Sequence, residues 1–191
     1  MQYKYIVIHH SLTYDGVTVD WQAIRNYHIN TLHWQDIGYH FGIEKIKTQL
    51  YDTYEILVGR ALNQPGAHTY GLNSQSIGIC IVGNFDKDIP NQNQINLLIN
   101  KLLKPLMLIF NIPISNIIGH REVYVLYKLK IFPKYYLKEN IKSCPGFNFS
   151  MKSVRDILTK DESLSIGNKV LLDNLNQFDN EVIKQKKIFW Q

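Results

Sequence analysis

Apolar runs in the first half of the chain predict the strands of a sheet. Residues 3–8 and 76–82 are almost continuously apolar, which is typical of strands that are buried on both faces. Residues 39–43 and 49–51 are shorter and more mixed, and we expect them to pair with each other. Residues 59–75 contain adjacent turn-forming proline and glycine residues and predict a loop.

Apolar residues that recur every three or four positions predict the helices. The first helix is expected over residues 20–28, with Asp20 as its N-cap. A second helix begins near Asn91, and Pro105 is expected to kink or end it. Residues 150–158 predict a short third helix. The face of the first helix that should be buried carries Trp21, Ile24 and either Tyr27 or His28.

Strands that alternate with helices indicate an α/β domain, which we place at residues 1–158. Residues 159–165 are polar and resemble a linker. Residues 167–189 then carry apolar side chains at spacings of four, three and four, which predicts an amphipathic helix. The tail at 159–191 is therefore expected to be a linker and a helix, and such a helix more often packs on its own domain than recruits a partner.

Charge, hydropathy and cysteine content favour an anionic partner and argue against a membrane-spanning or disulfide-rich protein. The net charge of +5 favours an anionic partner, such as nucleic acid, acidic lipid or an anionic cell-wall polymer, although a basic surface without a partner is equally compatible. No apolar run is long enough to predict a membrane span. Cys80 lies in an apolar strand and Cys144 in a turn, so a disulfide scaffold is not expected. The chain begins in its first strand, which predicts cytoplasmic synthesis without a signal peptide.

Three residues have settings that suit metal ligands. His9 ends the first apolar strand, His120 follows a second apolar stretch, and Cys144 stands in a turn that contains Pro145 and Gly146. Two imidazoles and one thiolate leave a tetrahedral zinc ion one open position, as in catalytic zinc sites. Each residue also has an alternative role: the histidines in the core or in a turn, and the cysteine as an inert buried thiol or a nucleophile. His10 should point to the opposite face of its strand and is not counted as a ligand.

With these residues in view, the chain resembles the zinc-dependent N-acetylmuramoyl-L-alanine amidases, a superfamily that includes peptidoglycan recognition proteins and phage endolysins. The similarity runs in order over about 150 residues. The step from His120 to Cys144, 24 residues, is longer than in the shortest members of the family. The segments that carry the resemblance are residues 6–11, 37–41, 67–68 with Asn73, 76–84, 118–122 and 142–147.

The resemblance implies a fold, a cofactor and a reaction. The implied fold is a central mixed β-sheet flanked by helices, here with a C-terminal helical extension. His9, His120 and Cys144 match the ligands of one zinc ion, Tyr39 matches the catalytic tyrosine, and Lys142 matches a lysine or threonine near the cysteine. The implied reaction cleaves the amide between N-acetylmuramic acid and L-alanine in peptidoglycan or its muropeptide fragments.

Further residues are expected to take part around the zinc ion. His40, His68 and Asn73 are candidates for lining the substrate groove. Lys142 is the candidate donor to the oxyanion, and Tyr39 is a candidate to hold water or to donate to the same oxygen. The acid that protonates the leaving amine is left open between Tyr39, His40 and Glu122.

The segment at residues 124–140 is rich in tyrosine and lysine and supports three interpretations. It could form a wall of the groove for an anionic glycan-peptide, cover the core of the domain, or bind nucleic acid through stacked rings and lysines. We rank the groove wall first and expect no nucleic acid partner.

Three classes of function compete at this point. The favoured one is a zinc amidase with a lytic, endolysin-type role, acting on the cell wall after release from the cytoplasm. A cytosolic muropeptide-recycling amidase is the nearest alternative. Both of these are zinc amidases and form the first class. The second class, a non-catalytic peptidoglycan-binding module, is less favoured because Cys144 is present. The third class is a cysteine hydrolase.

Overall fold

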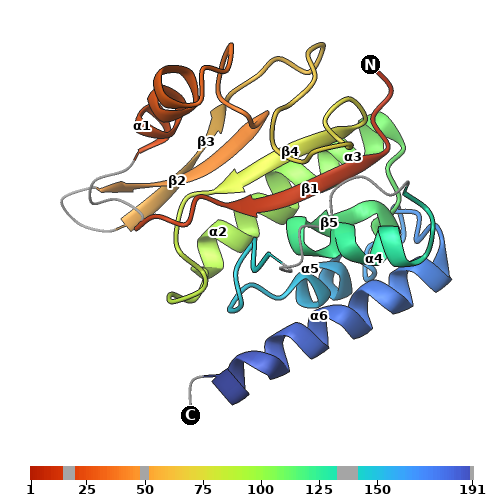
Figure 1. The fold of residues 1–191 in the computed structure, drawn as a ribbon. Helices are drawn as coiled ribbons and strands as arrows, with labels where there is room; N and C mark the ends of the chain where they lie inside the picture. The colour runs from red at the N-terminus through yellow and green to blue at the C-terminus, as the bar shows by residue number, and fades with distance from the viewer. Residues whose placement is uncertain (15–19, 48–51, 133–141, 190–191) are drawn as a thin grey trace.

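A computed structural model describes residues 1–14, 20–47, 52–132 and 142–189. Its centre is a mixed five-stranded sheet in the order β3-β2-β4-β1-β5 (Figure 1). Strand β1 pairs in parallel with β4 on one side and with β5 on the other, and only β3 runs antiparallel, against β2. The predicted α/β class with a mixed sheet is confirmed. The strands are β1 Tyr5–His10, β2 Phe41–Lys47, β3 Asp52–Val58, β4 Ser76–Ile81 and β5 Ile117–Gly119.

Alternation along β1 assigns its side chains to two different layers. Ile6 and Ile8 face a large core that is completed by the helices over residues 92–110 and by α5 (Met151–Leu158). Val7 faces the opposite layer, where α4 (Val123–Lys128) and α6 (Lys169–Phe189) pack. His9 shares the face of Val7, because successive strand residues point to opposite sides. The sheet is therefore covered on both faces, as Figure 1 shows.

The first two predicted helices exist but differ in detail from expectation. Helix α1 (Trp21–Asn26) is capped by Asp20 and continues as a π-helix, Tyr27–Thr31. His28, and not Tyr27, is the buried member of the pair. Pro105 does not end the second helix. The helix begins as α2 (Gln92–Leu97), widens into a π-helical stretch at Leu98–Leu103, and continues through Pro105 as α3 (Lys104–Phe110). The wider turns fall just before the proline, which cannot donate an ordinary helix hydrogen bond.

The second strand of the predicted hairpin lies further along the chain than expected. Residues 49–51, which were expected to form it, lie outside the described residues. The strand that pairs with β2 is β3, in a register that places Phe41 opposite Val58. Its sequence begins with two polar residues and ends with three apolar ones, so it shows no regular alternation, and we did not predict it as a strand.

The C-terminal segment packs closely on the rest of the protein. Leu171, Leu175 and Val182 of α6 are buried. The preceding segment, expected to be a linker, is attached by backbone hydrogen bonds from Ile114 and Ser115 to the carbonyls of residues 165 and 166. The packing favours α6 as part of the same folded unit. No helix within the described residues has the length and apolar character that crossing a membrane requires.

The tyrosine- and lysine-rich segment is described only as far as residue 132. Val125 and Leu126 of α4 lie in the core beside β1, and the ring of Phe132 packs over Gly71. This part covers the core, and none of its described residues lines the cavity beside His9, His120 and Cys144 that is described in the next section. The remaining residues of that interpretation, 133–140, lie outside the described residues.

Candidate metal centre

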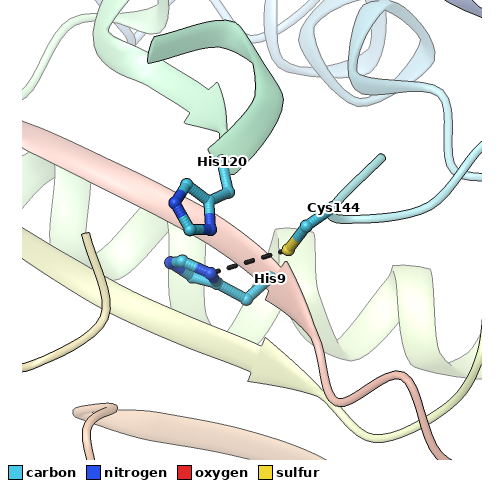
Figure 2. Close-up of side chains that lie close together, drawn as sticks. All are labelled: His9, His120 and Cys144. Carbon is cyan, nitrogen blue, oxygen red and sulfur yellow. Dashed lines mark hydrogen bonds between the residues drawn. The ribbon is translucent and has the colours of Figure 1, made fainter. Parts of the chain in front are cut away.

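The structure brings His9, His120 and Cys144 together at one edge of the sheet (Figure 2). One donor atom from each residue lies within 4.8 Å of the other two. His9 lies near the end of β1, and His120 directly follows β5, which pairs with β1 so that Ile8 lies opposite Gly119. The two imidazoles therefore lie side by side at the carboxyl ends of these parallel strands, and the turn at Cys144 places the thiol next to them.

The geometry and chemistry of this donor set fit a zinc ion. His9 Nδ1 lies 3.6 Å from Cys144 Sγ. A tetrahedral zinc ion with bonds of about 2.0–2.1 Å to nitrogen and about 2.3 Å to sulfur places such donors roughly 3.6 Å apart. Two nitrogen donors and one sulfur donor are also the ligand types that zinc prefers.

The second nitrogen of His9 is fixed from behind by the loop over residues 66–73. His9 Nε2 lies 3.1 Å from Nδ1 of His68 and 3.3 Å from the hydroxyl of Thr69. Asn73 holds this loop in place, since its side-chain oxygen accepts the backbone N–H groups of both His68 and Thr69 at 2.8 Å. Partners of this kind orient a metal-binding imidazole so that its other nitrogen faces the metal.

Burial keeps the three donors uncharged in the absence of a cation. Desolvation lowers the pKa of His120 to about 3, with a further contribution from Lys142, and lowers the pKa of His9 well below its usual value. Burial raises the pKa of Cys144 to about 12. Neutral imidazoles are the form that binds metal, whereas a thiol that stays protonated is a poor nucleophile. A bound cation would reverse the preference of the thiol, because coordinating thiols lose their proton. The direction of these shifts favours a ligand role for the Cys144 thiol over a nucleophilic one.

A cavity of about 410 Å³ opens beside the cluster. Tyr39, His68 and Lys142 line it together with the three donors. The ring of Tyr39 lies 5.2 Å from that of His9 between centroids, and burial followed by the neighbouring Cys80 raises the pKa of its phenol well above the usual value. Tyr39 therefore remains a proton donor across the working pH range, and Lys142 places an exposed cation at the rim.

Two residues expected to line the groove do not do so. His40 is fully buried, its Nδ1 accepts the N–H of Gly78, and its Nε2 lies near the carbonyl of Gln64 and the hydroxyl of Tyr3. It follows Tyr39 directly, so in extended chain it points to the other side. Asn73 supports the loop behind His9 instead of lining the cavity.

Glu122 is also separated from the cavity. Both of its oxygens accept hydrogen bonds from the guanidinium of Arg155, and one also accepts the N–H of Gly119. Its side chain is fully buried. Of the three acids considered for the leaving amine, only Tyr39 lines the cavity.

Sequence reasoning missed several residues that shape the site. Leu12 and Trp34 line the cavity, and Thr69 supports His9. Leu12 and Thr69 lie within three residues of His9 and His68, and Trp34 lies between the family-matched segments 6–11 and 37–41. No hydrophobic periodicity distinguishes these residues from their neighbours. Arg121 directly follows His120 and its role depends on contacts with distant carbonyls, which sequence spacing does not reveal.

Replacing His68 with glutamine is expected to weaken zinc binding by about 10- to 100-fold, because the change removes the ring nitrogen that faces His9 Nε2. Competition with a chromophoric chelator measures this effect. The control is His33→Asn, which changes an exposed histidine in left-handed backbone that asparagine tolerates. Equal zinc affinity in the two variants would contradict the role given to His68.

The metal-free protein is expected to lose stability on acidification. The pKa values of His68 and His120 are lowered to about 3 and that of His10 to about 4, chiefly by burial, from 6.5. Below pH 6.5 the unfolded chain therefore binds more protons than the folded chain, and stability falls as the pH decreases toward those lower values. We expect a loss of about 2 kcal/mol or more between pH 7 and pH 5. Urea unfolding with a chelator present measures it, and unchanged or greater stability at pH 5 would refute the expectation.

Comparison with known proteins places this site in a family. The sequence profile of Amidase_2, described as N-acetylmuramoyl-L-alanine amidase, matches residues 1–147. Peptidoglycan-recognition protein 2 of Holotrichia diomphalia is 35% identical over 98 residues, which cover 49% of this chain and 49% of that protein. The endolysin of Klebsiella phage KP32 is 36% identical over 89 residues, covering 46% of this chain and 54% of the endolysin. The chain thus spans about half the length of these curated relatives.

A solved structure shows the same arrangement of the chain. The N-acetylmuramoyl-L-alanine amidase LysC from Clostridium intestinale URNW superposes with a TM-score of 0.60 and 26% sequence identity, covering 83% of this chain and 86% of that one. The match of the family profile includes all three donors of the cluster. This chain belongs to the Amidase_2 family of N-acetylmuramoyl-L-alanine amidases and peptidoglycan recognition proteins, and within it resembles phage endolysins.

Proposed function

We propose that this protein is a zinc-dependent amidase that hydrolyses the bond between N-acetylmuramic acid and L-alanine in peptidoglycan. The observation that carries the proposal is the convergence of His9, His120 and Cys144 beside an open cavity that also contains Tyr39 and Lys142. Three protein ligands and an adjoining cavity match the requirement of a catalytic zinc ion for an open position.

The residues of the site divide the work of amide hydrolysis. His9, His120 and Cys144 would hold the zinc ion, which supplies Lewis-acid polarisation of a carbonyl oxygen. Lys142 donates hydrogen bonds to the negative charge that develops on that oxygen, and a group in this role typically contributes about 10²–10³ in kcat. Tyr39 keeps its proton and can donate to the reacting oxygen or to the leaving nitrogen from the wall of the cavity.

The charge of the cavity favours an anionic substrate. Lys142 places a positive charge at its rim. The stem peptide of peptidoglycan carries carboxylates, which a cationic rim attracts. The apolar side chains of Leu12 and Trp34 offer contact area for the sugar or the peptide backbone.

A lytic role is the setting we propose for this activity. The similarity to the endolysin of phage KP32 supports it, as does the similarity to the endolysin amidase LysCS from Clostridium intestinale, which covers 83% of this chain. In that setting the protein is made in the cytoplasm and reaches the wall after release. The similarity to a peptidoglycan-recognition protein supports a second candidate, binding of peptidoglycan without cleavage. Cys144 favours the amidase, because a zinc ion held by only two histidines would lack the third protein ligand of a catalytic site.

Mass spectrometry of products from a defined muropeptide tests the proposal. Wild-type protein should release a free stem peptide that begins with L-alanine, a chelator should stop the release, and added zinc should restore it. A control with the chelator already saturated by zinc separates metal removal from direct inhibition. Full activity after verified zinc removal would overturn the metal mechanism, and binding without any product would favour the recognition function.

A further inference from the structure

Helix α6 lies beyond the residues that the family profile matches, yet it contacts the structure that supports the metal cluster. Asp179 is completely buried although it is charged, and Asn176 lies one turn before it. Each of these side chains meets a buried arginine, and the two arginines lead to two different donors of the cluster. Figure 1 shows α6 packed along the side of the protein that contains α4 and α5.

The first connection leads from Asp179 to Cys144. Asp179 forms an ion pair with Arg121, and neither side chain is exposed. Arg121 donates to the carbonyls of Ser143 at 2.9 Å, Gly146 at 2.7 Å and Phe149 at 2.6 Å. These carbonyls lie on both sides of Cys144 in the chain, and the backbone N–H of Arg121 also binds the carbonyl of Cys144 itself. One guanidinium thus fixes the turn that presents the thiol.

The charge of Asp179 is needed for this arrangement. The Nε–H of Arg121 is buried without a partner among the described residues, so its terminal nitrogens carry all the compensation for burying the cation. Three of their four acceptors are neutral carbonyls, and Asp179 is the anion. Asp179 also accepts from the hydroxyl of Ser150 and the N–H of Lys152, which ties the start of α5 to the same group. A buried cation without its anion is strongly disfavoured.

The second connection leads from Asn176 to His120. The side-chain oxygen of Asn176 accepts from Nε of Arg155 at 2.8 Å. Arg155 forms a two-bond ion pair with Glu122, and Glu122 accepts the N–H of Gly119, the residue before His120. His9 does not depend on α6 in this way, since it lies in β1, an interior strand that pairs with β4 on one side and β5 on the other.

We propose that α6 is a positioning element of the metal site, in which Asp179 sets the Cys144 turn through Arg121, and Asn176 sets His120 through Arg155 and Glu122. The inference rests on the proposed zinc function. Its consequence is that α6 affects how tightly and with what geometry the metal is held, beyond its contribution to the stability of the fold. Metal ligands are sensitive to such support, because small displacements of one donor weaken coordination.

The test compares Asp179→Asn with Asp173→Asn, the same change at an exposed position of α6. Zinc affinity is measured by chelator competition at a temperature where both metal-free variants are folded by circular dichroism. Cobalt is then substituted for zinc, and the thiolate-to-cobalt charge-transfer absorption reports the geometry at the sulfur of Cys144. We expect Asp179→Asn to weaken zinc binding by about tenfold or more and to alter the cobalt absorption, and Asp173→Asn to match the wild type.

A milder variant keeps the test decisive if Asp179→Asn does not fold. Asn176→Ala removes one neutral acceptor at a partly exposed position and should weaken zinc binding severalfold while leaving the charge on Asp179 in place. Zinc affinity equal to wild type in the folded variants, with only a lower melting temperature, would overturn the inference and leave the proposed function intact. Wild-type protein that bound no zinc, or bound cobalt without the thiolate absorption, would overturn the proposed function as well.

Discussion

Cys144→Ala is expected to lower the rate of amide hydrolysis by at least about 10³-fold, because the variant loses the only sulfur donor of the described cluster. Lewis-acid stabilisation by a metal contributes several kcal/mol, and about 4 kcal/mol corresponds to that factor in rate. Product formation from a defined muropeptide measures the rate, and metal analysis of the purified variant measures the zinc content, which should fall well below one ion per chain.

The other cysteine supplies the matched control. Cys80 is fully buried in β4 and is not a member of the metal cluster. Cys80→Ala should therefore retain one zinc ion per chain even if packing beneath Tyr39 is loosened. A Cys144→Ala variant that bound zinc as tightly as wild type and kept its activity would show that the thiol is not a ligand.

Arg155→Ala is expected to lower the free energy of unfolding by about 3–5 kcal/mol, since it leaves the carboxylate of Glu122 buried without its cation. Both side chains are fully buried, and the guanidinium also donates to the carbonyl of Ile117 and to Asn176. Urea unfolding of the metal-free protein measures the loss without a contribution from zinc binding.

A second charged pair, with both of its members on α5, provides the comparison. Lys152 and Asp156 form an ion pair one turn apart on α5, with side chains that are 37% and 49% exposed. Lys152→Ala should change the free energy of unfolding by no more than about 0.5 kcal/mol, because exposed pairs contribute little. Similar decreases in the free energy of unfolding in the two variants would contradict the claim that the buried Arg155–Glu122 pair contributes more to stability than the exposed pair.

The sequence was sufficient to predict the main strands and the residues that converge as candidate metal donors. Strands β1 and β4 are so apolar that their burial is clear. A histidine that ends such an apolar run must lie near the carboxyl end of its strand. The family resemblance then selected His9 and His120 from seven histidines. That selection agrees with their convergence in the structure.

Sequence patterns did not reveal the residues that hold the candidate metal donors in place, or some details of the fold. His40 was assigned to the groove because it adjoins Tyr39, but neighbours in extended chain face opposite sides. Strand β3 was missed because its polar and apolar residues do not alternate regularly. Pro105 did not end its helix because a π-helical stretch precedes it and accommodates the missing N–H donor. The pair of Arg121 and Asp179 joins residues 58 positions apart, which local spacing cannot reveal.

Anomalous diffraction from crystals of the zinc-loaded protein, recorded on both sides of the zinc absorption edge, tests the central claim most directly. The account predicts one strong zinc peak per chain, within about 2.0–2.1 Å of a nitrogen of His9 and of His120 and about 2.3 Å from the sulfur of Cys144. The peak should disappear in Cys144→Ala crystals grown at the same zinc concentration. A peak bound by other residues, or no peak at this cluster in protein that cleaves muropeptides, would contradict the account.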